Sequence, residues 1–216
     1  MLSSFLPIFF TMLIVVDPVG IVPIFMGLTS RIPHDKKAGI INKAVLVSFL
    51  VLLGFVFLGR FILELLHIEP GSFFIAGGIM LFIIALEMLF GFSSHSKVSE
   101  REQSPPDYQH SRPIAIFPLA IPMLAGPGSL TTIILYAGGY TKVGNEFNYT
   151  EVSIMLVIAI VLVLAIAALF LRGSVLVLKF LKQTGVSVME RIMGLLLAGL
   201  SVQFVYDGIL HLGFKP

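Results

Sequence analysis

Six long apolar stretches separated by polar segments limit this chain to one class of fold. A bilayer core is about 30 Å thick, and a helix needs about 20 residues to cross it. The chain is 57% hydrophobic and only 12% charged, whereas a soluble domain carries about 25% charged residues. The sequence therefore predicts an all-α integral membrane protein with six transmembrane helices. The expected spans cover residues 5–28, 38–63, 72–92, 113–137, 152–178 and 188–212.

The first expected span contains Asp17-Pro18-Val19-Gly20 near its centre. Asp17 is the only ionisable side chain in the first 30 residues, and an intramembrane carboxylate marks a functional site by default. Pro18 and Pro23 lack an amide hydrogen and free backbone carbonyls one turn earlier, while Gly20 lets a ligand approach the backbone. We interpret the segment as a break between two half-helices. The alternative is a proline kink with an aspartate that caps the next helical segment.

A second interrupted segment, Gly126-Pro127-Gly128-Ser129, follows the first at an offset of 109 residues and makes the fourth span discontinuous. Two further pairs of segments match at offsets of 112 and 116, whereas a competing register of 104 pairs the prolines instead. Three spans per half would reverse the second half in the membrane, which is the inverted repeat typical of secondary transporters. We expect a first three-helix repeat at 1–92, a cytoplasmic linker at 93–112 and an inverted second repeat at 113–216.

The distribution of basic residues predicts the orientation. One set of loops and span ends holds eleven Lys and Arg residues and the other set holds three. Because basic loops remain in the cytoplasm, both termini are expected on the non-cytoplasmic side of a cell membrane, which for a bacterial chain means the inner membrane.

The two interrupted segments offer backbone groups that suit a zwitterion. Helix N-termini attract anions such as carboxylates, whereas Asp17 and the carbonyls that end the preceding half-helices favour an ammonium group. The small residues around the breaks leave room for a small substrate. We expect a small neutral amino acid to bind at Asp17, Pro18, Val19, Gly20, Gly126, Pro127, Gly128, Ser129, Thr131 and Thr132.

Glu87 and Gln203 are second-rank candidates that, with Asp17, could couple transport to protons. They match each other at the offset of 116. Glu87 lies within about two helical turns of the end of its span. An equally good interpretation is that its carboxylate simply extends to the lipid headgroups. Four glycines are expected to allow close helix packing rather than to bind ligand: Gly77, Gly78, Gly194 and Gly199.

Other chemistries are not expected. The chain has no cysteine, and its five histidines lie in loops or at span ends, so the sequence predicts no metal site and no cofactor. A phosphate-binding glycine loop followed by Lys-Ser or Lys-Thr is absent, which argues against an ATP-driven pump. The spans hold no histidine pair and no sequence cluster of carboxylates, which an intramembrane enzyme would need. We do not expect an enzyme.

Four motifs follow one another along the chain: Asp17-Pro-Val-Gly-Ile-Val-Pro-Ile-Phe25, Ile75-Ala-Gly-Gly-Ile79, Pro118-Leu-Ala-Ile-Pro122 with Ala125-Gly-Pro-Gly128, and Arg191-Ile-Met-Gly-Leu-Leu196. In this order they resemble the MarC family, which also contains the small neutral amino acid transporters called SnatA. The resemblance covers essentially the whole chain. It implies discontinuous first and fourth spans and transport of glycine, alanine and similar amino acids. Many members have an asparagine where this chain has Asp17, so it stays open whether Asp17 couples transport or shapes the break.

The leading hypothesis is a secondary active transporter of small neutral amino acids that works by alternating access. Proton coupling through Asp17 or Glu87 is left open. The alternative is an exporter of other small molecules or drugs, whose site should be larger and more aromatic. The expected partners are glycine or alanine and the lipid bilayer, with no nucleic acid; the sequence does not fix the oligomeric state.

Overall fold

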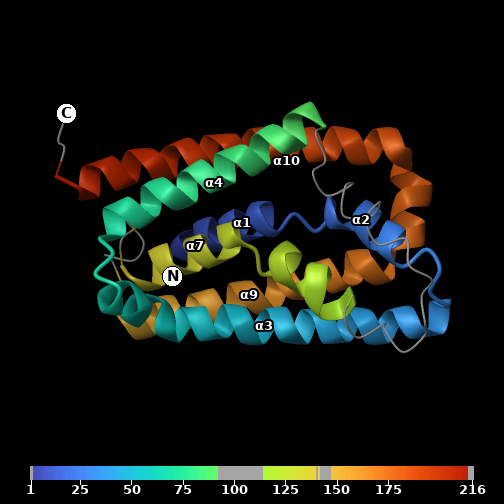
Figure 1. Ribbon diagram of the computed structural model, residues 1–216, viewed down its shortest axis with the longest axis horizontal. Helices are drawn as coiled ribbons and strands as arrows, with labels where there is room; N and C mark the ends of the chain where they lie inside the picture. The colour runs from blue at the N-terminus through green and yellow to red at the C-terminus, as the bar shows by residue number, and fades with distance from the viewer. Residues whose placement is uncertain (1, 92–113, 140, 142–146, 214–216) are drawn as a thin grey trace.

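The computed structural model describes residues 2–91, 114–139, 141 and 147–213. Within these residues the regular structure is entirely helical (Figure 1). The expected linker at 93–112 lies outside the described residues. The elements are α1 (Leu2–Val16), α2 (Ile21–Leu28), α3 (His34–Leu65), α4 (Pro70–Phe90), η2 (Ala115–Leu124), α7 (Pro127–Ala137), α9 (Tyr149–Arg172) and α10 (Ser174–His211).

The helices confirm the expected all-α membrane fold. Five segments of the described chain are long and apolar enough to cross a bilayer, and the first of them combines α1 and α2 as Ser4–Leu28. A sixth crossing is available if η2 and α7, which meet at a bend of 51°, form one span. The first and fourth spans are therefore both interrupted, where the sequence places its proline- and glycine-rich segments.

The fifth span ends earlier than its hydropathy predicts. Residues 152–178 are expected to form one helix, but α9 ends at Arg172, and α10 begins at Ser174 after Gly173. Lys182 then has left-handed, non-helical backbone (φ 53°, ψ 176°), so the membrane-length part of α10 is Thr184–His211. The apolar residues that follow Ser174 continue the hydropathy pattern, and this pattern alone cannot show that the chain changes direction (Figure 1).

The helices are arranged so that each span of the first half packs against its expected counterpart in the second half. Helix α4 packs on α10, α3 on α9, and α1 on α7. In Figure 1 the α4–α10 pair covers one side of the central α1 and α7, and the α3–α9 pair covers the other. Helix α1 begins and α10 ends at the same end of the bundle, as six crossings require. The inverted relation of the halves and the side that faces the cytoplasm stay predictions.

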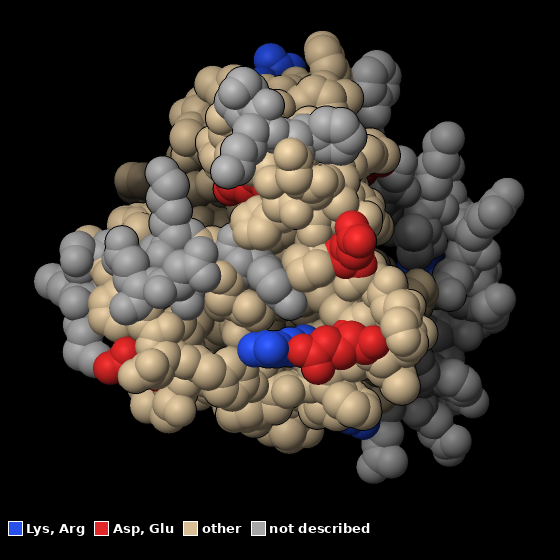
Figure 2. All heavy atoms as spheres, turned by 90° about the vertical axis from the view of Figure 1, so that its left-hand side faces the viewer, with Lys and Arg blue, Asp and Glu red and all other residues tan. Residues whose placement is uncertain are grey.

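Helix α7 lies in the centre of the bundle and is buried along nearly its whole length. It contacts α1, α3, α4 and α9, so it has no lipid-facing side. The outer helices instead expose large apolar side chains, for example Leu50 and Phe61 of α3. Figure 2 shows one end of the bundle, where a few charged residues lie among other described residues. An apolar exterior around a buried, interrupted helix is what a lipid environment requires.

Glycines bring α4 and α10 into close contact. A Cβ atom on Gly78 would lie 2.8 Å from the carbonyl oxygen of Ser201, and one on Gly194 would lie 2.9 Å from Cβ of Met88. Gly77 is similarly packed against the side chain of Thr131. The packing role expected for these three glycines is confirmed. It is wrong for Gly199, which has open space where a Cβ would lie.

Candidate functional site

The break between α1 and α2 is formed by Asp17 and the residues that follow it. The N–H of Asp17 still donates to the carbonyl of Leu13 at 3.0 Å. Its own backbone is left-handed at φ 44°, a conformation that Asp and Asn tolerate better than most residues. Helix α2 then starts at Ile21, after Gly20 as its N-cap. The first span therefore contains two half-helices separated by a break at residues 17–20.

The carboxylate of Asp17 folds back over this break. Its Oδ2 atom lies against Gly20 so closely that any side chain there would clash with it, and it accepts hydrogen bonds from the backbone N–H groups of Gly20 and Val19. The second oxygen, Oδ1, is buried and has no hydrogen-bond partner within the described residues. Asp17 thus binds the backbone of the break with one oxygen, while the other has no partner.

The second break lies between η2 and α7. Phe117 and Ile121 have extended backbone inside η2, because a residue before a proline is disfavoured from the helical region. Gly126 is the extended N-cap of α7, with Pro127 at the first helical position. A side chain at Gly126 would meet the carbonyl oxygen of Pro122, so this turn requires glycine.

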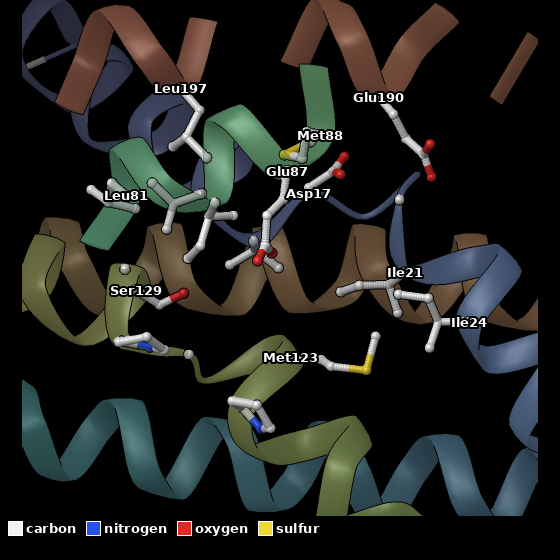
Figure 3. A pocket seen from close by; sticks show the side chains of 18 of the residues that line it. Asp17, Ile21, Ile24, Leu81, Glu87, Met88, Met123, Ser129, Glu190 and Leu197 are labelled. Atoms are coloured by element: carbon white, nitrogen blue, oxygen red, sulfur yellow. The ribbon is translucent and has the colours of Figure 1, made fainter. Parts of the chain in front are cut away.

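The two breaks face a common cavity of about 400 Å³. Its walls come from parts of residues 15–27, 81–91 and 122–129, and from Glu190 and Leu197 of α10 (Figure 3). The inner wall includes Leu81 and Leu197, which are each 1% exposed. At the other end, Gly27 and Gly91 are exposed and form the mouth.

The cavity contains most, but not all, of the residues that the sequence singles out. Pro18 and Val19 belong to the first break without lining the cavity. Thr131 packs against Gly77, and Thr132 donates to the carbonyl of Gly128 at 2.9 Å, so neither hydroxyl faces the cavity. The predicted residues that do line it are Asp17, Gly20, Gly126, Pro127, Gly128, Ser129 and Glu87.

The two residues paired by the expected repeat have different surroundings. Glu87 lines the cavity (Figure 3), which favours a role at the site over a simple reach to the headgroups. Gln203 is exposed and donates a hydrogen bond to Asp207 at 2.8 Å on its own helix. Gln203 is not among the residues that line the cavity. The sequence repeat that pairs it with Glu87 therefore does not place the two residues at equivalent positions in this site.

Sequence reasoning missed Glu190, which lines the cavity from α10. Beside Arg191 at the start of the sixth span, it reads as an ordinary interfacial residue. The spacing of three residues in α10 could have identified Glu190. Glu190, Gly194 and Leu197 are separated by four and three residues and share one helix face. Gly194 packs on Met88 and Leu197 lines the cavity, so this face points inward.

The described residues give the cavity an acidic lining. Asp17, Glu87 and Glu190 line it, and no Lys, Arg or His is among the lining residues that the structure describes. Nowhere in the described chain are three His, Cys, Asp or Glu residues grouped closely enough to hold a metal ion. Ser129 is the only hydroxyl among the lining residues, and its Oγ is 3.5 Å from the carbonyl oxygen of Leu124. The site can accept hydrogen bonds from a cationic group.

Comparisons with known proteins match this chain over nearly its whole length. The family model described as "MarC family integral membrane protein" matches residues 2–212. The chain is 34% identical to the UPF0056 membrane protein YhcE of Escherichia coli, covering 94% of this chain and 92% of YhcE. It is 32% identical to a UPF0056 membrane protein of Pyrococcus abyssi, covering 96% and 95%, and 31% identical to YvbG of Bacillus subtilis, covering 97% and 95%. No solved structure matches significantly.

Proposed function

The chain belongs to the MarC family of integral membrane proteins, and we propose that it is a secondary transporter of small neutral amino acids of the glycine and alanine class. The observation on which this proposal depends is the cavity between two interrupted spans. Interrupted helices that meet near the membrane midplane are how secondary transporters build substrate sites, because broken backbone is tolerated there only when it lines a cavity.

The chemistry of the cavity supports a zwitterionic substrate. Oδ1 of Asp17 is a buried acceptor without a partner, and an ammonium group supplies donors for it. On the opposite wall, Gly128 and Ser129 occupy the first turn of α7, where backbone N–H groups lack helical partners and attract a carboxylate. The lining residues around Ser129 are glycines and apolar residues, so the described part of this wall has no further polar side chain with which a large polar substrate could pair.

The proposal also covers how transport proceeds. A cavity with one exposed end and one buried end fits one state of an alternating-access cycle. We propose transport rather than catalysis because the only lining hydroxyl is directed at a main-chain carbonyl and no histidine lies beside it. Proton coupling through Asp17 or Glu87 is part of the proposal, as is a cell inner membrane location with both termini on the non-cytoplasmic side.

A second candidate function is export of other small molecules, including drugs. The volume of the cavity favours it, because about 400 Å³ falls within the roughly 300–1,000 Å³ of drug-sized pockets. Met88 and Met123 line the same cavity, and flexible methionines adapt to varied apolar ligands. No aromatic side chain lines it, however, and its three carboxylates would disfavour uncharged apolar compounds.

Counterflow of labelled alanine in proteoliposomes tests the proposal. We expect the wild-type protein to exchange alanine, glycine to compete, and alanine methyl ester to compete far less because it lacks the carboxylate. Lack of any alanine exchange, or equal competition by the ester, would contradict a zwitterion site. Alanine-independent efflux of an apolar cationic dye would support the second candidate instead.

A further inference from the structure

Glu190 is a carboxylate that the proposed transport site does not yet use. It lines the cavity from α10, as Asp17 does from the α1–α2 break (Figure 3), and the two negative charges repel each other. Its side chain is half-buried and makes no ion pair within the described residues. A carboxylate in this position increases the electrostatic cost of the empty cavity, so its presence requires an explanation.

Asp17 provides independent evidence that a ligand belongs between the two groups. Its Oδ2 atom is occupied by the backbone of the α1–α2 break, whereas Oδ1 is buried and has no donor within the described residues, and Asp17 is one of the residues that line the cavity. A buried acceptor without a partner costs about 1–3 kcal/mol, and more when it is charged. A ligand with N–H donors would remove this cost when it binds.

The ligand must supply positive charge. Asp17 and Glu190 carry like charges, and their repulsion is stronger than in water where burial lowers the effective dielectric constant, as it does around Asp17. Among the described residues, no Lys, Arg or His of the lining compensates them, and Glu87 adds a third carboxylate on the α4 wall. A primary ammonium has three donors and one positive charge, so it can bind two carboxylates at once.

We propose that Glu190 is a substrate-recognition residue and that the substrate ammonium binds between its carboxylate and Oδ1 of Asp17. This inference rests on the transport function proposed above and adds a residue from the sixth span to the site. The substrate then joins α10 to the α1–α2 break. Recognition of the ammonium is therefore shared by two helices, whereas the carboxylate is left to the first turn of α7.

Variants of Glu190 and analogues of alanine, tested in the same counterflow assay, separate recognition of the ammonium by Glu190 from a purely structural role. We expect Glu190→Gln to raise the half-saturating alanine concentration by about tenfold or more, as expected for one charged hydrogen bond. Inhibition by alaninamide, which keeps only the ammonium, should weaken by a similar factor. Inhibition by propionate, which keeps only the carboxylate, should not change. Glu190→Asp should recover part of the affinity because the charge is retained.

The matched control is Glu69→Gln, an exposed carboxylate that precedes α4 at the opposite end of the bundle. Unfolding temperatures of all variants in detergent show whether each remains folded. If Glu190→Gln exchanges alanine like Glu69→Gln, the inference is wrong while alanine transport stands. If it changes only the dependence on sodium or protons, the cation is inorganic and the inference is also wrong. Absence of exchange in the wild type would instead reject the proposed function itself.

Discussion

Gly27 offers a way to block the cavity without disturbing the packing of the helices. It lies in α2 at the mouth of the cavity, and a Cβ atom built there has no neighbour within 4 Å. Gly128, the more obvious choice, is unsuitable, because a side chain there would collide with Leu81 and Val15. Substitution of Gly128 would therefore lower transport through misfolding as readily as through the site.

We predict that Gly27→Leu stabilises the protein slightly and abolishes most transport. Leucine favours a helix over glycine by roughly 0.7 kcal/mol, and nothing within 4 Å opposes the new Cβ. The same side chain adds apolar bulk at the entrance, and displacing a substrate even slightly can reduce turnover by about tenfold or more. Stability and transport should therefore change in opposite directions, which a folding defect cannot produce.

Gly199→Leu is the matched control. Gly199 is also helical and has open space around it, but it lies on α10 outside the cavity lining. It should gain a similar stability and keep wild-type alanine exchange. The measurements are thermal unfolding in detergent and counterflow in proteoliposomes. Wild-type exchange by Gly27→Leu, at equal reconstitution, would refute the assignment of this cavity as the substrate path.

Two further substitutions test individual features of the fold. Asp17→Ala should lower the unfolding free energy by about 1–2 kcal/mol, because alanine neither accepts hydrogen bonds from the backbone of the break nor favours the left-handed backbone at φ 44°. Asp17→Asn should keep this stability, and equal losses for both variants in chemical unfolding would contradict this role of the side chain. Gly78→Ala should cost about 1–3 kcal/mol because its Cβ would lie 2.8 Å from the carbonyl oxygen of Ser201; an unchanged unfolding temperature would show that α4 and α10 can separate freely.

The sequence predicts the backbone of the site better than its side chains. Proline and glycine act locally, so the breaks after Asp17 and around Gly126 can be located from the chain alone. Which side chains then face the cavity depends on helix rotation. Thr131 and Thr132 follow the second break directly, yet the helical turn of α7 directs one toward Gly77 and the other toward its own backbone.

Long-range packing explains the remaining differences. Glu190 reads as interfacial because hydropathy averages over all faces of a helix, whereas its cavity-facing side follows from the contact of Gly194 with α4. The end of α9 at Arg172 was missed because apolar residues continue beyond it. A glycine alone does not fix close packing either, as Gly78 and Gly199 show by their opposite surroundings.

Among the described lining residues, exposed Gly27 and Gly91 lie at one end of the bundle. The mouth of the cavity that they form lies at the end where α3 begins with Lys36 and Lys37. Toward the other end, α1 and α7 pack together, and the hydroxyls of Thr11 and Tyr136 are 3.5 Å apart in the buried interface between them. Under the predicted orientation, in which the basic ends remain in the cytoplasm, this mouth would face the cytoplasm.

Single cysteines test this orientation directly, because the chain has no cysteine of its own. We predict that Gly27→Cys reacts with a membrane-impermeant maleimide from the cytoplasmic side and that alanine slows the reaction. Thr11→Cys should react slowly from either side, because its side chain is buried between α1 and α7. Gly39→Cys, exposed on α3 outside the cavity, should react from the cytoplasmic side whether or not alanine is present. Reaction of Gly27→Cys only from the opposite side would reverse the topology, and equal protection of Gly39→Cys by alanine would show that the effect does not arise in the cavity.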